Sequence, residues 1–292
     1  MALARTEAGT HVRMAIPSRA RRILVLLGMV CAAATVLVLA ANSGATLNDP
    51  VGYRVYEIGI TAVAVGLLTV GVWQSVQLGR FSRLLLMSVA AGTAFWQETY
   101  GDWGAYCLYS ARFITYDWGH TVWSAPVRCW WFIAGYMVFY TSFFFALIAA
   151  VKFARNRWPS ANPYITAALV SLPAFYVFDL VWEGTATGLG YWNYMHTFGP
   201  AMHVGKGTFP LLWPIIEQVP FMALAAYALT WRNSRGEDLF ELAAGFVLRR
   251  RPGQIAILTS WIVIVNVAFL TTTILPIMAL RWIAGPASAA MP

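Results

Sequence analysis

Long apolar runs recur along the whole chain, and they restrict it to the folds that a lipid bilayer allows. A window of roughly 20 residues, the length that spans a bilayer as a helix, finds seven such runs. They lie at residues 22–42, 55–78, 84–98, 129–151, 163–183, 209–231 and 255–280. Only 11% of the residues are charged, whereas a soluble domain has about 25%. We therefore predict an all-α fold, a polytopic transmembrane helical bundle with about seven spans.

The basic residues predict how this bundle is oriented. Fifteen of the 20 lysines and arginines lie at the N-terminus and in the segments 80–83, 152–157 and 232–251, which share one side of the bundle if the spans alternate. The opposite side has five, namely Arg54, Arg112, Arg128, Lys206 and Arg281. Because cytoplasmic loops are enriched in Lys and Arg, we predict a multi-pass protein of the cell membrane. Its N-terminus is expected in the cytoplasm and its C-terminus outside.

One domain accounts for nearly all of the chain. Residues 1–21 form a basic cytoplasmic segment, residues 22–283 a single transmembrane helical domain, and residues 284–292 a short C-terminal tail. The first apolar run is long enough to be a retained span rather than a cleaved signal peptide. Two outer loops, 99–128 and 184–208, are long and rich in aromatic residues. Such loops are typical of interfacial aromatic belts or of a lid folded over a pocket.

Carboxyl groups interrupt the apolar runs near their outer ends. Glu98 and Asp102 are four residues apart, and so are Asp179 and Glu183; Glu217 lies inside a later run. The four-residue spacing places Asp179 and Glu183 on one helix face. Carboxylates at membrane depth are costly and usually face a bundle interior or a water-filled cavity. We therefore expect these five groups to meet in an acidic pocket on the extracytoplasmic side.

Carboxyls that share a low-dielectric site cannot all ionise easily, so one stays protonated near neutral pH. A protonated and an ionised carboxyl together can perform general acid–base catalysis. Glu217 also lies between Pro214 and Pro220, which loosen the helix, and freed backbone carbonyls are tolerated where they line a cavity. The structural alternative is that some of these carboxyls pair with Arg112 or Arg128, or bond between helices.

Metal and cofactor motifs are not evident. The cysteines have no CxxC spacing, and Cys107 and Cys129 either pair across a loop or, as the favoured interpretation, remain two packed thiols. The outer-loop histidines have no HxxxH spacing, and the sequence has no phosphate loop, nucleotide fingerprint or nucleophile elbow. The basic residues lie between spans rather than in one patch, so we expect no nucleic-acid partner. A hydrophobic small molecule and the lipid bilayer are the expected partners.

Several short motifs, taken in order, resemble the spirocyclase AveC-like family of integral membrane proteins. The resemblance covers roughly residues 84–231, with the family's Trp-Gln-Asp-Pro replaced by Trp-Gln-Glu-Thr and its asparagines by Asp102 and Asp117. The motifs are Phe95-Trp96-Gln97-Glu98, Asp102-Trp103-Gly104, Phe113-Ile-Thr-Tyr-Asp-Trp-Gly119, Asp179-Leu-Val-Trp-Glu183, Gly190-Tyr191-Trp192 and Pro214-Ile-Ile-Glu217.

The resemblance implies an enzyme that closes a dihydroxy-ketone polyketide into a spiroketal, with loss of water and without a redox cofactor. Glu217 and Asp179 would then be the principal acid and base, with Glu98, Asp102 and Glu183 as their partners. The expected substrate-binding residues are Trp96, Gln97, Trp103, Tyr116, Trp182, Trp192 and Gln218.

Other functions use the same residues and stay open at this point. A proton-coupled transporter or carrier of a hydrophobic small molecule would use the carboxyls as a relay, although the missing internal repeat and the one-sided acids argue against alternating access. A carotenoid or lipid hydratase-dehydratase would use them on a different substrate. A non-catalytic scaffold or sensor would not need so many buried acids.

Overall fold

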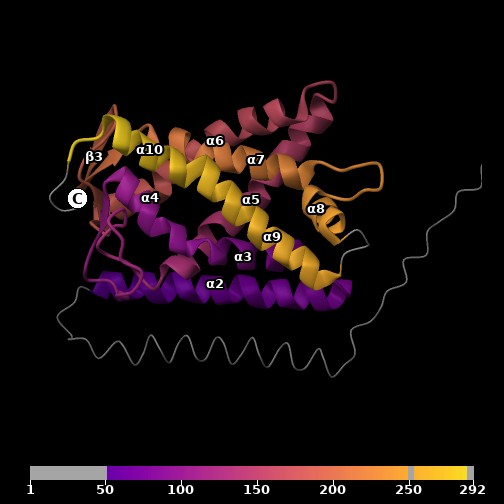
Figure 1. Cartoon of the computed structure of the whole chain (residues 1–292), viewed down its shortest axis with the longest axis horizontal. Helices are drawn as coiled ribbons and strands as arrows, with labels where there is room; N and C mark the ends of the chain where they lie inside the picture. The colour runs from indigo at the N-terminus through magenta and orange to yellow at the C-terminus, as the bar shows by residue number, and fades with distance from the viewer. Residues whose placement is uncertain (1–50, 249–252, 288–292) are drawn as a thin grey trace, which may run out of the picture.

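The computed structural model describes residues 51–248 and 253–287, which form an elongated and mostly helical bundle (Figure 1). Helix α2 (Val51–Leu78) runs along one edge, and α9 (Gln254–Phe269) and α10 (Leu275–Ala284) follow each other diagonally across it. The strands, α4 and the end of α10 gather at one end, whereas α8 lies at the other. The other helices are α3 (Arg83–Thr93), α4 (Glu98–Ala105), α5 (Phe132–Arg157), α6 (Pro163–Leu189), α7 (Val219–Thr230) and α8 (Leu239–Leu248).

Four helices in the described ranges are long and apolar enough to cross a membrane, as judged by length and composition. They are Gly52–Leu78, Phe132–Arg157, Pro163–Leu189 and Gln254–Ala284, and they coincide with the predicted spans 55–78, 129–151, 163–183 and 255–280. The predicted span 22–42 lies outside the described residues. The total of seven spans and the orientation of the termini stay predictions.

The predicted span 84–98 is not one helix. Helix α3 has 11 residues and is followed by a 3-10 turn, Phe95–Gln97, and then by α4. The chain thus stays helical to Ala105, beyond the predicted boundary and through Gly101. A Cβ atom added at Gly101 would lie 2.9 Å from the side chain of Ile274, and one added at Gly104 would lie 3.0 Å from the backbone nitrogen of Met278. The two glycines therefore let α4 pack closely against the last helix.

Helix α6 also continues past its predicted end at residue 183. Its N-cap is Asn162, whose side chain accepts hydrogen bonds from the backbone nitrogens of Tyr164 and Ile165 at 2.9 and 3.2 Å. Its C-cap is Gly190, which has a φ of 80°. The left-handed conformation is inexpensive for glycine and terminates helices. Glu183 consequently lies inside a helix rather than at its frayed end.

Short strands in the two long loops, and at the start of the predicted span 209–231, correct the purely helical prediction. Strand β1 (Cys107–Tyr109) pairs antiparallel with β2 (Trp192–Tyr194), so that Cys107 faces Tyr194 and Tyr109 faces Trp192. Strands β3 (Ala201–Val204) and β4 (Gly207–Pro210) form a second hairpin. The first pairing joins segments more than 80 residues apart, which local sequence patterns do not reveal. Because this pairing satisfies backbone N–H and C=O groups of the strand residues, the loops can pack against the bundle.

Candidate active site

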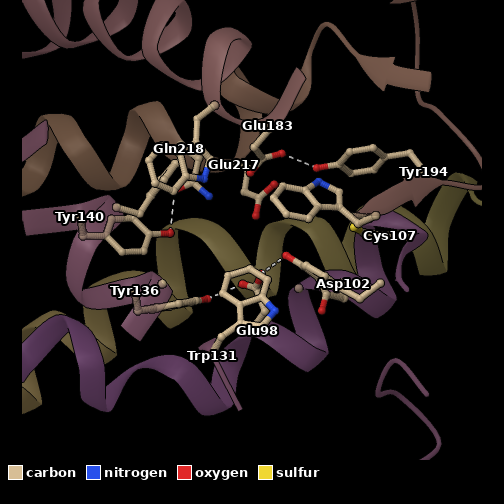
Figure 2. A pocket seen from close by; sticks show the side chains of 17 residues that line it. Glu98, Asp102, Cys107, Trp131, Tyr136, Tyr140, Glu183, Tyr194, Glu217 and Gln218 are labelled. Atoms are coloured by element: carbon tan, nitrogen blue, oxygen red, sulfur yellow. Dashed lines mark hydrogen bonds between the residues drawn. The ribbon is translucent and has the colours of Figure 1, made fainter. Parts of the chain in front are cut away.

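An acidic cavity lies where α4, α5 and α6 meet the strands β1 and β2 (Figure 2). Its volume is about 60 Å³, and its lining is chemically repetitive. Four carboxyls, four phenols, three indoles, a thiol and an amide surround it: Glu98, Asp102, Glu183, Glu217, Tyr109, Tyr136, Tyr140, Tyr194, Trp131, Trp182, Trp192, Cys107 and Gln218.

Glu98, the first residue of α4, is held by two phenols. Tyr109 from β1 donates to Oε1 at 2.7 Å, and Tyr136 from α5 donates to Oε2 at 2.6 Å. Both oxygens thus act as acceptors, which is the role of an ionised carboxylate. Burial raises the pKa of Glu98, whereas the hydrogen bonds from Tyr136 and Tyr109 lower it. Hydrogen bonds of this charge-assisted kind are about twice as strong as neutral ones.

Glu183 and Gln218 each have a single phenol donor. Tyr194 on β2 donates to Oε2 of Glu183, and Tyr140 on α5 donates to Oε1 of Gln218 at 3.0 Å. Burial, followed by the charge of Glu183, raises the pKa of Tyr194 well above its usual range. The phenol therefore keeps its proton and remains a donor. Strand β2, in the loop after α6, thus supplies the hydrogen-bond donor to Glu183, which lies on one of the helices long enough to span a membrane.

Glu217 lies in a π-helical turn, η2 (Pro214–Gln218), that precedes α7. Its carboxyl projects into the cavity on the side of Glu183, as Figure 2 shows. The neighbouring Gln218 amide is its hydrogen-bond partner. Since Tyr140 donates to the amide oxygen, the amide nitrogen of Gln218 is free to donate to Glu217. Single π turns inside α-helices occur frequently at functional sites.

Asp102 lies one turn after Glu98 on α4 and is buried. Burial raises its pKa well above the usual range, the charges of Glu98, Glu217 and Glu183 raise it further, and a hydrogen bond with Cys107 opposes them. Its Oδ2 atom has no hydrogen-bond partner among the described residues. We conclude that the Asp102 carboxyl holds a proton under conditions in which an ordinary aspartate is ionised.

The structure brings four of the five candidate carboxyls and three of the candidate substrate-binding residues to this cavity. Asp179 does not line it: it is buried one helical turn before Glu183, and its Oδ1 atom has no partner within the described part of the chain. Its electrostatic neighbours are nevertheless Glu183 and Glu217. Asp179 is therefore placed to influence the cavity carboxyls rather than to touch a ligand.

The remaining candidates lie elsewhere. Trp96 and Gln97 donate to the Oδ1 atom of Asn266 on α9, each at 3.1 Å, and they join the 3-10 turn Phe95–Gln97 to α9. Trp103 packs under the guanidinium of Arg281, at 3.9 Å from its ring centroid. Tyr116 stacks on an exposed loop tryptophan at 4.5 Å. None of these four residues lines the cavity.

The outer arginines have other partners than the cavity carboxyls. Arg128 is buried and donates to Thr99, to the Trp118 carbonyl and to Ser124, at 2.6–3.2 Å. Arg112 lies over the ring of Tyr53, 5.9 Å from its centroid. Among the described residues, neither arginine forms an ion pair with a cavity carboxyl.

The thiols of the two loop cysteines, Cys107 and Cys129, are both free and buried. The interpretation that favoured unpaired, packed thiols is therefore confirmed.

Sequence reasoning missed the phenols. Tyr136 and Tyr140 are four residues apart within an apolar run, so both lie on one helix face. That spacing is the only signal in the sequence for a phenolic wall. Tyr109 and Tyr194 gave none, because loop tyrosines are ordinary components of aromatic belts.

The fold and the cavity define a class of protein: a helical membrane-type bundle with an acidic and aromatic cavity at one end. A family model described as spirocyclase AveC-like matches residues 79–290. The chain therefore belongs to the spirocyclase AveC-like family, and the four cavity carboxyls all lie inside the matched region. Searches of curated proteins and of solved structures give no significant match.

Proposed function

We propose that the protein is a cofactor-independent membrane enzyme that cyclises a hydrophobic, polyketide- or lipid-like hydroxy-ketone to a spiroketal by acid–base catalysis. The observation that carries the proposal is that the four carboxyls around one cavity have different hydrogen-bond partners. Glu98 accepts from two phenols, Glu183 from one, Glu217 from an amide, and Asp102 has an unpartnered oxygen. Membership of a spirocyclase family supports the same chemistry.

The reaction needs one proton donor, one proton acceptor and a stabilised cation. A substrate hydroxyl adds to the ketone carbon, giving a hemiketal. Protonation of the hemiketal hydroxyl then releases it as water and leaves an oxocarbenium ion. The second substrate hydroxyl attacks this ion and loses its proton, so the net change is the loss of one water molecule.

The residues that line the cavity suggest which group performs each step of the cyclisation. We assign proton donation to Glu217, whose side chain enters the cavity (Figure 2) and has the Gln218 amide as its hydrogen-bond partner. Glu183, oriented by Tyr194, would take the proton of the attacking hydroxyl. Glu98, fixed by its two phenols, would face the oxocarbenium charge, because preorganised charges lower such barriers without reorganising. Asp179, a predicted acid or base, would act through Glu183.

Aromatic faces complete the proposed site. Trp131 and Trp192 stack with their ring centroids 6.1 Å apart, and both line the cavity. A cation near such faces is stabilised by roughly 0.5–2 kcal/mol. The cavity of about 60 Å³ is far smaller than the roughly 300–1,000 Å³ of common ligand sites. The cavity would admit the reacting carbon and its oxygens. One wall of the cavity would have to move to admit the carbon chains of the substrate.

The test uses purified protein in lipid nanodiscs and synthetic symmetric dihydroxy-ketones of graded length. Uncatalysed cyclisation of a symmetric substrate gives equal amounts of both spiroketal enantiomers, so chiral gas chromatography separates enzymatic product from background. We expect an excess of one enantiomer from the wild type. Removing the donor in Glu217→Gln should lower that rate by about 10²–10⁴-fold, the usual contribution of general acid–base catalysis.

The matched control is Glu237→Gln. Glu237 lies in the loop after α7, where it accepts a hydrogen bond from Asn233 at 2.7 Å, so its replacement should leave the rate unchanged. Racemic product at the enzyme-free rate with every substrate would overturn the proposal. Uptake of the same compounds into sealed vesicles, driven by a proton gradient, would favour a carrier instead. An alkene or a hydrated product would favour a hydratase-dehydratase.

A further inference from the structure

Two π-helical turns lie against each other beside the cavity. The first, η2, carries Glu217, and the second, η3 (Leu270–Ile274), separates α9 from α10. Each is followed by one residue and then a proline, Pro220 after η2 and Pro276 after η3. A proline lacks the backbone N–H group, and its ring crowds the carbonyl four residues earlier. In both cases that carbonyl belongs to the π turn, which widens the helix where the crowding occurs.

A single side chain bridges the two turns. The hydroxyl of Thr273 donates to the main-chain carbonyl of Glu217 at 2.7 Å, and Thr273 is 0% exposed. The two preceding threonines behave differently, because Thr271 and Thr272 donate to carbonyls of their own helix at 2.8 and 2.7 Å. Of these three consecutive hydroxyls, Thr273 is thus the one that reaches another helix.

We infer that Thr273 is a positioning residue that holds the Glu217 carboxyl in the cavity by fixing the π turn beneath it. A helix that relaxed from a π turn to regular α geometry would change register by one residue. That change rotates a side chain by about 100° around the helix axis, enough to turn Glu217 away from the cavity. The inference rests on the proposed function in one respect, the role of Glu217 as proton donor.

Other groups around Glu217 act on its charge but not on its position. Glu183 from α6 and Glu98 and Asp102 from α4 are its electrostatic neighbours. We expect all three to stay in place when Thr273 is changed, because they lie on α4 and α6 and not on the turn that carries Thr273. A Thr273 variant should therefore alter the titration of Glu217 only if it moves the carboxyl relative to these groups.

The experiment compares Thr273→Val, which removes the hydroxyl at nearly constant shape, with Thr273→Ser, which restores it, and with Thr271→Val as the matched control. A neutral hydrogen bond is worth roughly a twofold to tenfold change in an equilibrium. We expect kcat for the dihydroxy-ketone to fall by about that factor in Thr273→Val, with KM unchanged. Thr273→Ser and Thr271→Val should match the wild type.

A second readout does not depend on catalysis. Infrared spectra at a series of pH values show the protonated carboxyl band of Glu217, identified by its loss in Glu217→Gln. Its titration midpoint should move in Thr273→Val but not in Thr271→Val. If the valine variant does not fold, Thr273→Ala carries the same comparison.

The outcomes separate the two ideas. Equal kcat values and equal midpoints in the Thr273 and Thr271 variants would overturn the positioning role. If the wild type makes no spiroketal, the proposed function fails while the infrared midpoints still decide the role of Thr273.

Discussion

Removing the phenol of Tyr136 tests whether Glu98 works as a fixed anion. In Tyr136→Phe the ring remains in the core and only the hydroxyl is lost, so one of the two donors to Glu98 disappears. The other donor, Tyr109, is on a different element and stays. The variant thus changes the support of one carboxyl without opening a large cavity.

The expected size follows from the geometry. A hydrogen bond to a charged group contributes about 1.5–3 kcal/mol, so losing the Tyr136 donor removes about that much stabilisation from ionised Glu98. Because this bond lowers the pKa of Glu98, its loss should raise that pKa. If Glu98 must be ionised, activity that fails as the pH falls will fail at a higher pH in the variant than in the wild type.

The assay is the initial rate of enantiomerically enriched spiroketal formation, measured across the pH range for wild type and variant. Tyr140→Phe is the matched control, because Tyr140 lies on the same helix and donates at 3.0 Å to the neutral amide of Gln218. Its loss should cost about 0.5–1.5 kcal/mol of stability without moving the acid limb. The reasoning is refuted if the acid limbs of Tyr136→Phe and Tyr140→Phe coincide.

Two further predictions concern stability. The pKa of Asp102 is raised on folding, so the folded state binds the proton more tightly than the unfolded state. The free energy of unfolding should therefore fall as the pH rises above about 3.9. Melting temperatures of Asp102→Asn should depend less on pH than those of the wild type, and equal slopes would contradict this. A methyl group added in Gly104→Ala would lie 3.0 Å from the backbone of Met278. We therefore expect overpacking to reduce the free energy of unfolding by about 1–3 kcal/mol, seen as a lower melting temperature. The control is alanine at Gly59, where nothing lies within 4 Å, which should not lower the melting temperature.

The sequence was sufficient to predict that four of the five carboxyls, all but Asp179, line one cavity, but not to predict their hydrogen bonds. Glu98, Asp102, Glu183 and Glu217 come from separate stretches, and the cost of charge at membrane depth is enough to infer that they share an interior. Which phenol reaches which oxygen depends on helix rotation and on the β1–β2 register. These quantities are set by packing across the bundle, so periodicity within one stretch cannot supply them.

The helix irregularities show the same division. Prolines at 214 and 220 predict a loosened helix around Glu217, and the structure has a π turn there. Pro276 is consistent with the second π turn, but no pattern in the run Leu270–Pro276 predicts that this turn faces the first. The extension of α4 through Gly101 was also missed, because glycine disfavours helices by intrinsic propensity. Close packing against the last helix overrides that propensity.

The proposed chemistry depends on carboxyls of the same kind being made unequal, and the two parts of the fold contribute differently to that result. The helical bundle supplies burial, which disfavours charge on every carboxyl alike. The donors then differ from group to group: β1 and α5 give Glu98 two phenols, β2 gives Glu183 one, and Glu217 has the Gln218 amide in place of a phenol. Burial alone would leave a set of equivalent acids. It is the placement of donors, half of them on the paired loops, that would let one cavity hold a proton donor and an anion together.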